Sequence, residues 1–289
     1  MAKPGWLTIT PASTEKYNGI RGTLASLGLN TVCSSAHCPN TSECWSAGTA
    51  TFMVLGNTCT RGCRFCAVPK GAKGAVVDRD EPERLAKAIR EWRLKYAVVT
   101  SVCRDDLEDQ GSCHFAACIK EIKRLNPGTM VEVLIPDFHG SVSCLKTVAD
   151  ANPDVIGHNV ETVERLSSRI RDPRASYKLS LAVLKAVKKL DGTVYTKSAM
   201  MLGFGETESE VIQTMKDLRQ ANVDFLAIGQ YLRPGVRHAK VEEYISPEKF
   251  EALGQAARKL GFMYVASGPF VRSSYRAQEA FLQSKAGRK

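Results

Sequence analysis

The sequence predicts an α/β fold, a partial (β/α)6 barrel of the TIM type with short extensions at both ends. Three observations lead to this prediction. From residue 48 onward, runs typical of strands alternate with runs typical of helices, at a step of roughly 25–40 residues. No low-complexity linker interrupts this series. The chain has 289 residues with 44% hydrophobic content, which is enough to bury one barrel-sized core.

The expected elements follow in chain order. Residues 1–32 form a mixed segment with a short helix at Thr14–Leu27, which ends at Gly28 because glycine readily terminates a helix. Strands are expected at the apolar runs, namely Thr51–Gly56, Tyr96–Val102, Met130–Ile135, Val155–Val160, Val194–Leu202 and Phe225–Tyr231. Helices are expected at the amphipathic runs between them, namely Glu81–Lys95, His114–Leu125, Val142–Ala151, Val163–Ile170 with Leu179–Leu190, Glu206–Ala221 and Pro247–Leu260. A further strand at Met263–Ala266 and a helix after Ser274 complete the chain.

Six of the ten cysteines lie between residues 33 and 66, in two sets of three. Cys33, Cys38 and Cys44 have the spacing C-x4-C-x5-C, and the second set, with the spacing C-x3-C-x2-C, is Cys59, Cys63 and Cys66. Structural zinc takes four ligands, and neither set has a fourth cysteine in phase. Three thiolates are suited to a [4Fe–4S] cluster, because they bind three irons and leave the fourth for another ligand.

The surroundings of the two sets differ. Residues 48–71, GTATFMVLGNTCTRGCRFCAVPKG, predict a buried strand that leads into the second set, at the strand end where parallel α/β folds place their sites. The first set begins at Cys33 and continues through the polar segment SSAHCPNTSEC, which we expect only a cluster to order. The C-x3-C-x2-C spacing, with Phe65 directly before its last cysteine, resembles the signature of the radical S-adenosylmethionine (SAM) superfamily. The C-x4-C-x5-C set upstream, followed by GTATFMVLG, narrows the resemblance to the lipoyl synthase family.

This resemblance implies a sulfurtransferase with two [4Fe–4S] clusters and SAM as cofactors. Cys59, Cys63 and Cys66 would hold the cluster that cleaves SAM to a 5′-deoxyadenosyl radical. That radical would abstract hydrogen at C6 and C8 of an octanoyl chain on a carrier-protein lysine. The auxiliary cluster of Cys33, Cys38 and Cys44 would donate two sulfurs, which gives the lipoyl group.

The resemblance also assigns the extensions. It divides the chain into residues 1–47 with the auxiliary-cluster cysteines, a radical SAM barrel at 48–260, and residues 261–289, where the RSSY motif stands. In this family a serine of RSSY is the fourth ligand of the auxiliary cluster, and we assign Ser274, with Ser273 as the alternative. Taken alone, RSSY is typical of a helix N-cap.

Loops after the other strands provide candidates for contacts with SAM. Phe65 belongs to this group by its place in the cysteine motif. Asp105 and Asp106 in TSVCRDDL match the family pattern, although an acidic loop that caps the next helix is the alternative. Asn159 and Glu161 project to one face of the HNVET stretch by strand periodicity.

Three further residues match the family pattern. Arg171 suits a carboxylate such as that of SAM, with an ordinary surface arginine as the alternative. Lys197 and Ser198 lie in a TKSG-like stretch. The chain also departs from the pattern, with Cys103 where Asp is usual, Gly157 where Asn is usual and Ala199 where Gly is usual. Any role of these positions is therefore in doubt.

Composition limits the partners. The formal net charge of +10 indicates an acidic partner, but the Lys and Arg residues are dispersed and form no nucleic-acid-binding motif. The resemblance implies an octanoylated carrier protein or lipoyl domain, a reduced ferredoxin or flavodoxin-type electron donor, and an iron–sulfur carrier that rebuilds the cluster. The opening MAKPGWLTIT lacks a signal-peptide run and no apolar stretch approaches membrane-spanning length, so we expect a cytoplasmic protein without a membrane partner.

Two other functions remain to be weighed. A radical SAM enzyme that inserts sulfur into free dethiobiotin would share the C-x3-C-x2-C loop but not the upstream triad with RSSY. A non-catalytic iron–sulfur or zinc protein would need closed four-ligand sites, which the two triads do not provide.

Overall fold

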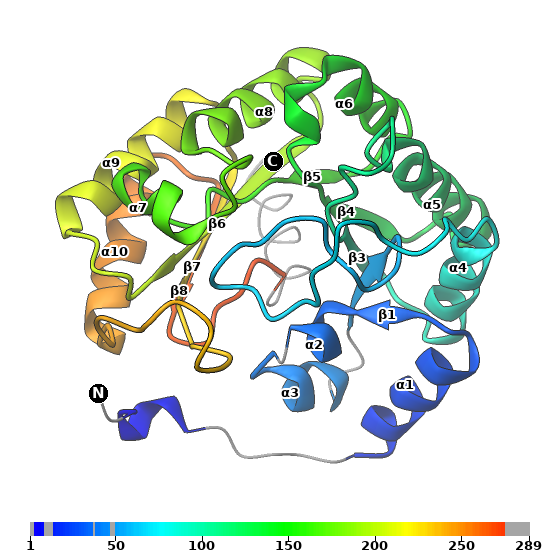
Figure 1. Cartoon of the computed structure of the whole chain (residues 1–289), viewed down its shortest axis with the longest axis horizontal. Helices are drawn as coiled ribbons and strands as arrows, with labels where there is room; N and C mark the ends of the chain where they lie inside the picture. The colour runs from blue at the N-terminus through cyan, green and yellow to red at the C-terminus, as the bar shows by residue number, and fades with distance from the viewer. Residues whose placement is uncertain (1–2, 9–13, 37, 47–49, 275–289) are drawn as a thin grey trace. The chain divides into compact units, whose positions relative to one another are not determined.

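Parallel strands followed by helices make up both units into which the chain folds (Figure 1). The computed structural model describes residues 3–8, 14–36, 38–46 and 50–274. The N-terminal unit comprises Ile9–Gly62 and Ala67–Ile156. The C-terminal unit comprises Met1–Thr8, Cys63–Cys66 and Gly157–Lys289. The second cysteine set is therefore divided between the two units, with Cys59 in the N-terminal one.

The N-terminal unit begins with helix α1, which Thr14 caps by accepting a hydrogen bond from the Tyr17 N–H. Its elements are α1 (Glu15–Ser26), β1 (Asn30–Thr31), α2 (Val32–Ser35), α3 (Thr41–Ser46), β2 (Thr51–Val54), α4 (Glu81–Glu91), β3 (Tyr96–Ser101), α5 (Ser112–Leu125), β4 (Met130–Leu134), η2 (Phe138–Gly140), α6 (Val142–Ala149) and β5 (Val155–Gly157), whose last residue belongs to the C-terminal unit. Helices α4, α5 and α6 lie outside strands β3 and β4 in Figure 1.

Register in this unit is set by parallel pairing. Thr51 of β2 is opposite Val98 of β3, and Tyr96 of β3 is opposite Met130 of β4. Every residue of β2 is buried, as expected for parallel strands that are covered on both faces. The short strand β1 pairs antiparallel with β2 and so adds an edge strand in front of the first parallel strand.

The C-terminal unit has the same layering. Its elements are η1 (Gly5–Leu7), α7 (Glu164–Ile170), α8 (Tyr177–Leu190), β6 (Tyr195–Leu202), α9 (Glu208–Gln220), β7 (Phe225–Gln230), α10 (Pro247–Lys259) and β8 (Tyr264–Gly268). Lys197 of β6 is opposite Phe225 of β7, which in turn is opposite Tyr264 of β8. The core between strands and helices includes Met200, Met215, Leu218, Ile228, Phe250 and Leu253, each at most 3% exposed.

The prediction of an α/β fold with a parallel sheet is confirmed. Expected strands and helices occur within a few residues of their predicted bounds, and Gly28 after α1 has a positive φ of 61°, as a terminating glycine requires. In the segment of the first cysteine set, Cys33 lies in α2 and Cys44 lies in α3, and the prediction that only a cluster orders this segment stays a prediction. The expected helix after Ser274 lies outside the described residues. Within the described part of the chain, no helix is long and apolar enough to cross a membrane.

Candidate functional site

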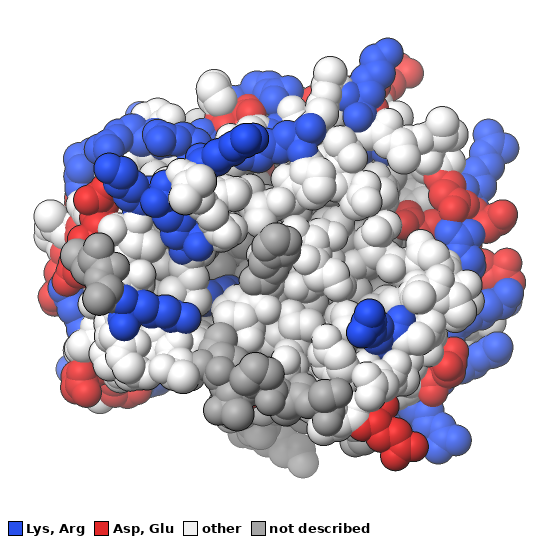
Figure 2. Space-filling view, turned by 60° about the horizontal axis from the view of Figure 1, so that its bottom comes forward, with Lys and Arg blue, Asp and Glu red and all other residues white. Residues whose placement is uncertain are grey.

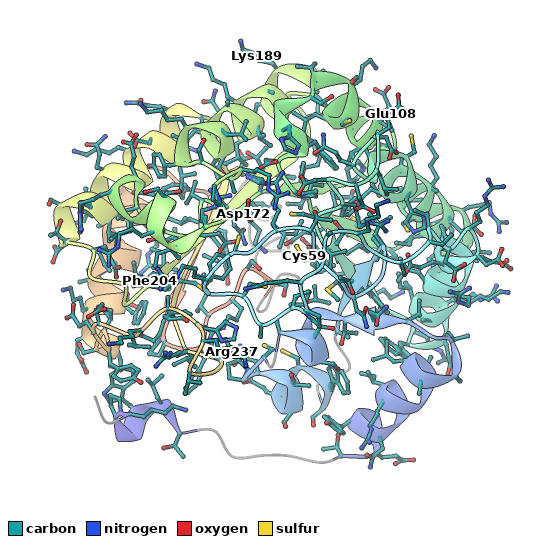
Figure 3. All side chains as sticks on the ribbon, viewed as in Figure 1. Cys59, Glu108, Asp172, Lys189, Phe204 and Arg237 are labelled. Atoms are coloured by element: carbon teal, nitrogen blue, oxygen red, sulfur yellow. The ribbon has the colours of Figure 1, made fainter. Side chains whose placement is uncertain are left out.

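Cys59 lies in the loop after β2, within the N-terminal unit (Figure 3). Backbone hydrogen bonds fix it, from the Cys59 N–H to the Pro69 carbonyl at 2.8 Å and from the Gly71 N–H to the Cys59 carbonyl at 3.0 Å. The Cys103 backbone N–H donates to the Cys59 Sγ at 3.4 Å. The Cys103 side chain lowers the pKa of Cys59 to about 6, and burial opposes this shift. The N–H donor and the lowered pKa both favour the thiolate form of Cys59, which is the form that binds a metal.

Arg61, two residues after Cys59, anchors this loop within the N-terminal unit. Its guanidinium donates to both carboxylate oxygens of Asp137, at 2.5 and 2.7 Å, and to Asp105 at 2.8 Å. The Arg61 side chain is 3% exposed, so these are buried ion pairs. His139 adds a 2.7 Å hydrogen bond to Asp105. Burial disfavours ionisation of Asp105, but Arg61 and Thr60 outweigh it and lower the pKa of Asp105 to about 2.

Cys63 and Cys66 are fixed within the C-terminal unit. The Asp172 backbone N–H donates to the Cys63 Sγ at 3.3 Å (Asp172 is labelled in Figure 3). His238 Nε2 is 3.2 Å from the Cys66 carbonyl oxygen. Between the two cysteines, Phe65 packs against the core of this unit. Two thiols of the same motif therefore each accept a backbone N–H, Cys59 in one unit and Cys63 in the other.

Arg171, directly before Asp172, is 6% exposed and forms no salt bridge with a carboxylate among the described residues. Its guanidinium donates to the Ser180 hydroxyl at 2.8 Å and to two backbone carbonyls, whereas its Nε has no hydrogen-bond partner. The carboxyl group of Glu161 interacts electrostatically with this guanidinium, and the unpartnered Nε is a buried donor that is available to a further acceptor. The alternative of an ordinary surface arginine was wrong.

Asn159 and Glu161 lie beyond the end of β5, and the Asn159 amide donates to the Glu161 carboxylate at 3.2 Å. Glu161 has a positive φ of 66°, a conformation that non-glycine residues rarely adopt. Burial raises the pKa of Glu161, while Arg171 and Asn159 oppose the shift. Strained backbone of this kind clusters at ligand sites, and here the strained residue carries a carboxyl group that interacts with the buried Arg171 guanidinium.

Other predicted cofactor residues have protein partners. Asp106 pairs with Arg104 at 2.8 Å, and Asp105 with Arg61 as described. The Ser198 hydroxyl accepts the Val160 N–H at 3.2 Å and is fully buried, as is most of Lys197. Their contacts with a cofactor stay predictions. Gln230 and Tyr231 bind backbone groups of the loop after β7.

The first cysteine set lies wholly in the N-terminal unit. The Cys38 N–H donates to the Cys33 carbonyl at 3.0 Å, and the Thr41 hydroxyl lies 2.8 Å from the Cys38 carbonyl and 3.1 Å from that of Cys33. These bonds fix Cys33 and Cys38 relative to each other, and the Cys44 N–H donates to the Asn40 carbonyl at 2.8 Å. Within residues 3–8, 14–36, 38–46 and 50–274, no three Cys, His, Asp or Glu side chains converge on a single metal ion.

Ser273 and Ser274 follow β8 in a segment that packs tightly on β7. A Cβ placed on Gly229 would lie 2.0 Å from the Val271 carbonyl oxygen, so glycine is required for this close approach. The Gln230 N–H also donates to the Pro269 carbonyl at 3.3 Å. The tail of the C-terminal unit is thus fixed up to the serines, while Tyr275 of the RSSY motif lies outside the described residues.

The sequence analysis did not identify several residues that orient the site. The role of Arg61 is recognisable only in the structure, where it pairs with Asp137, 76 residues away in the sequence. Asp172 acts through its backbone and His238 lies in a long loop, so neither carried a signal in the sequence. Arg61 had one weak signal, its position inside the cysteine motif.

Comparisons with known proteins agree on a family. The model of the "Radical SAM superfamily" matches residues 53–218. The chain is 52% identical to a lipoyl synthase of Methanocella arvoryzae, over 97% of this chain and 95% of that protein. It is 54% identical to a lipoyl synthase of Caldanaerobacter subterraneus subsp. tengcongensis, over 95% of each chain.

Solved structures share the fold at low sequence identity. The hydrogenase maturase HydG of Carboxydothermus hydrogenoformans superposes with a TM-score of 0.58 at 14% identity, over 81% of this chain and 65% of that one. Methylornithine synthase (PylB) gives a TM-score of 0.51 at 10% identity, over 95% and 93%.

Proposed function

Because this chain belongs to the lipoyl synthase family of the radical SAM superfamily, we propose that it inserts two sulfur atoms, at C6 and C8, into an octanoyl chain on a carrier-protein lysine. The product is the lipoyl group. Bound together, a [4Fe–4S] cluster and SAM would supply the radical that removes hydrogen from unactivated C–H bonds. The chain itself binds, orients and shields these groups.

Cys59, Cys63 and Cys66 hold the SAM-cleaving cluster in this proposal. Backbone N–H groups donate to the sulfurs of Cys59 and Cys63, and such bonds favour the thiolate form that binds iron. The fit is chemical as well, since Cys59 has a pKa lowered to about 6. Three ligands leave one iron for the amino and carboxylate groups of SAM.

The single observation that carries the SAM assignment is the buried Arg171, whose Nε has no hydrogen-bond partner among the described residues, next to the residue that contacts Cys63. A guanidinium at this place suits the carboxylate of SAM. Glu161, held at a positive φ beside Asn159, is suited to the cationic amine or the ribose. The remaining proposed cofactor residues are Phe65, Asp105, Asp106, Lys197 and Ser198. Asp105 and Asp106 also anchor the loop that carries them, through their ion pairs with Arg61 and Arg104.

The sulfur donor is the cluster of Cys33, Cys38 and Cys44, with Ser274 as its fourth ligand and Ser273 as the alternative. A serine oxygen binds iron more weakly than a thiolate, which suits a cluster that must be opened. In this proposal, residues 1–47 and 261–289 provide the ligands of the auxiliary cluster, and residues 48–260 form the radical SAM barrel.

The partners follow from the reaction. They are an octanoylated carrier protein or lipoyl domain, a reduced ferredoxin or flavodoxin-type donor, and an iron–sulfur carrier. Lys and Arg side chains gather at the upper left of the face in Figure 2, and the net charge of +10 favours an acidic carrier. We propose the cytoplasm as the location.

Anaerobic reconstitution tests the proposal. About eight irons per chain are expected, four for each cluster. Incubation with SAM, a reductant and an octanoyl-lysine peptide should add sulfur to the peptide at two 5′-deoxyadenosines per product. SAM cleavage with no sulfur on the peptide, but sulfur on dethiobiotin, would instead assign a biotin synthase-like reaction. Binding of one cluster without SAM cleavage would assign a non-catalytic iron–sulfur protein.

A further inference from the structure

Arg64, inside the second cysteine set, joins three segments of the C-terminal unit. Its backbone N–H donates to the Ile170 carbonyl at 2.8 Å, and its own carbonyl accepts the Ala239 N–H at 2.8 Å. Its guanidinium also donates to the Arg169 carbonyl at 3.3 Å. The end of α7 and the loop between β7 and α10 are therefore both fixed against the segment Cys63–Cys66.

The loop between β7 and α10 presents an ordered tip beside these cysteines. His238 Nε2, 3.2 Å from the Cys66 carbonyl oxygen, ties the loop to the cysteine segment. The Arg233 guanidinium donates to the His238 carbonyl at 3.0 Å and also to the Val236 carbonyl. This closed turn holds out two side chains, Val236, which is 86% exposed, and the exposed Arg237, labelled in Figure 3.

The three joined segments carry positive charge on their surface. Four of their arginines are exposed and are called here the arginine rim, namely Arg64, Arg169, Arg233 and Arg237. In the described part of the chain, the guanidinium groups of Arg169 and Arg237 form no ion pair. Of the acidic residues close by in the sequence, Asp172 pairs with Arg174 at 2.8 Å, and the Glu242 N–H donates to the loop after β6. The rim therefore offers free cations around one exposed apolar side chain.

We propose that the arginine rim is the docking surface for a small acidic ferredoxin, which reduces the cluster held by Cys59, Cys63 and Cys66. This inference rests on the proposed function and assigns the electron donor a place on the chain. Docking passes one electron, so the ferredoxin is oxidised and the cluster is reduced. An electron donor needs only a brief contact near the cluster ligands, and a small charged surface suits such weak encounters.

The first test reverses the charge of the two unpaired arginines, in Arg169→Glu with Arg237→Glu. Formation of 5′-deoxyadenosine from SAM is followed with a bacterial ferredoxin, kept reduced by NADPH and ferredoxin reductase, or with dithionite. We expect the KM for ferredoxin to rise roughly tenfold or more at low ionic strength, because two attractions become two repulsions. The rate with dithionite, a small reductant that needs no docking surface, should equal that of the parent.

Lys185→Glu with Lys189→Glu is the matched control. These exposed lysines of α8 belong to the same unit, form no ion pair among the described residues and lie away from Arg237, as Figure 3 shows for Lys189. The control changes the net charge by the same amount, so its KM should stay close to that of the parent. Added salt should raise the KM of parent and control but have little effect on the reversed variant. Equal KM values for the reversed variant and the control would overturn the proposal.

Photocross-linking covers the case in which the reversed variant binds no cluster. With p-benzoylphenylalanine in place of Val236, light should cross-link ferredoxin to the loaded chain. The same substitution at Val142, which is 58% exposed on α6 of the N-terminal unit, should give no product. Cross-linking of an octanoylated lipoyl domain but not of ferredoxin at position 236 would assign the rim to the carrier protein and overturn the proposal. Equal yields at both positions would overturn it as well.

The two reductants separate this inference from the proposed function. A parent protein that cleaves SAM with dithionite but not with ferredoxin overturns this inference alone. A parent protein that cleaves SAM with neither reductant overturns the proposed function with it.

Discussion

Arg61→Met removes the cation that joins the cysteine loop to two carboxylates of the N-terminal unit. Arg61 is 3% exposed, and the variant leaves Asp105 and Asp137, 11% and 1% exposed, without their charge partner. Breaking a buried pair in this way costs about 3–5 kcal/mol. The pKa of about 2 for Asp105, against an ordinary value of 3.8, corresponds by itself to roughly 2 kcal/mol.

The assay is guanidinium unfolding of the metal-free chain at pH 7. Lys146→Met is the matched control, because Lys146 and Asp150 form an exposed pair on α6, 59% and 58% exposed. It should cost less than about 0.5 kcal/mol. Adding Asp105→Asn and Asp137→Asn to Arg61→Met should recover part of the loss, since no buried charge then stays unpaired. A loss below about 1 kcal/mol for Arg61→Met would refute the reasoning.

The same pair predicts a pH dependence. The pKa of Asp105 is depressed in the folded state, so its stabilisation is complete above the unfolded pKa and is lost as the pH falls through the folded value of about 2. The parent should therefore lose about 2 kcal/mol more than Arg61→Met between pH 4 and pH 2. Parallel curves for the two proteins would contradict the assignment of the shift to Arg61.

Three more predictions follow from other contacts. Thr207→Ala removes the capping box of α9 and should lower the unfolding free energy by about 1 kcal/mol in the same assay. Gly229→Ala forces a Cβ against the Val271 carbonyl and should cost about 2 kcal/mol or more with loss of auxiliary-cluster iron, whereas Gly128→Ala, which meets no atom within 4 Å, should do neither. Arg171→Gln should weaken SAM binding at least tenfold by calorimetry with iron content unchanged; unchanged affinity would remove Arg171 from the SAM site.

Much of the fold was predictable because strand and helix signals in this chain are local. The apolar run before Cys59 and the amphipathic run of α4 each determine their own structure, whatever lies elsewhere. The short pieces were not predictable. Strand β1 has two residues and exists because β2 offers an open edge, and α2 has four residues capped by Thr31. Intrinsic propensity over two to four residues is too weak to determine secondary structure, so tertiary contacts determine whether such short elements form.

The site shows the same difference between local signals, which the sequence reveals, and tertiary contacts, which it does not. The cysteine spacings are local, so they predict the ligands without reference to the rest of the chain, and that assignment stays a prediction. The contacts that orient those ligands join distant residues: Arg61 meets Asp137, and the Asp172 N–H meets the sulfur of Cys63, 109 residues earlier in the chain. The type of residue at a position does not reveal a backbone hydrogen-bond donor, because every residue except proline has a backbone N–H.

That distinction decides which substitutions can probe the cysteine loop. The N–H groups of Cys103 and Asp172 that reach the sulfurs survive any side-chain change other than proline. The side chain of Cys103 can be altered, and it contributes the largest share of the lowered pKa of Cys59. Cys103→Ala should therefore raise the pKa of Cys59 in the metal-free chain and slow its alkylation at pH 7, since the thiolate is the reactive form. Unchanged alkylation would mean that the backbone donors alone hold the thiolate.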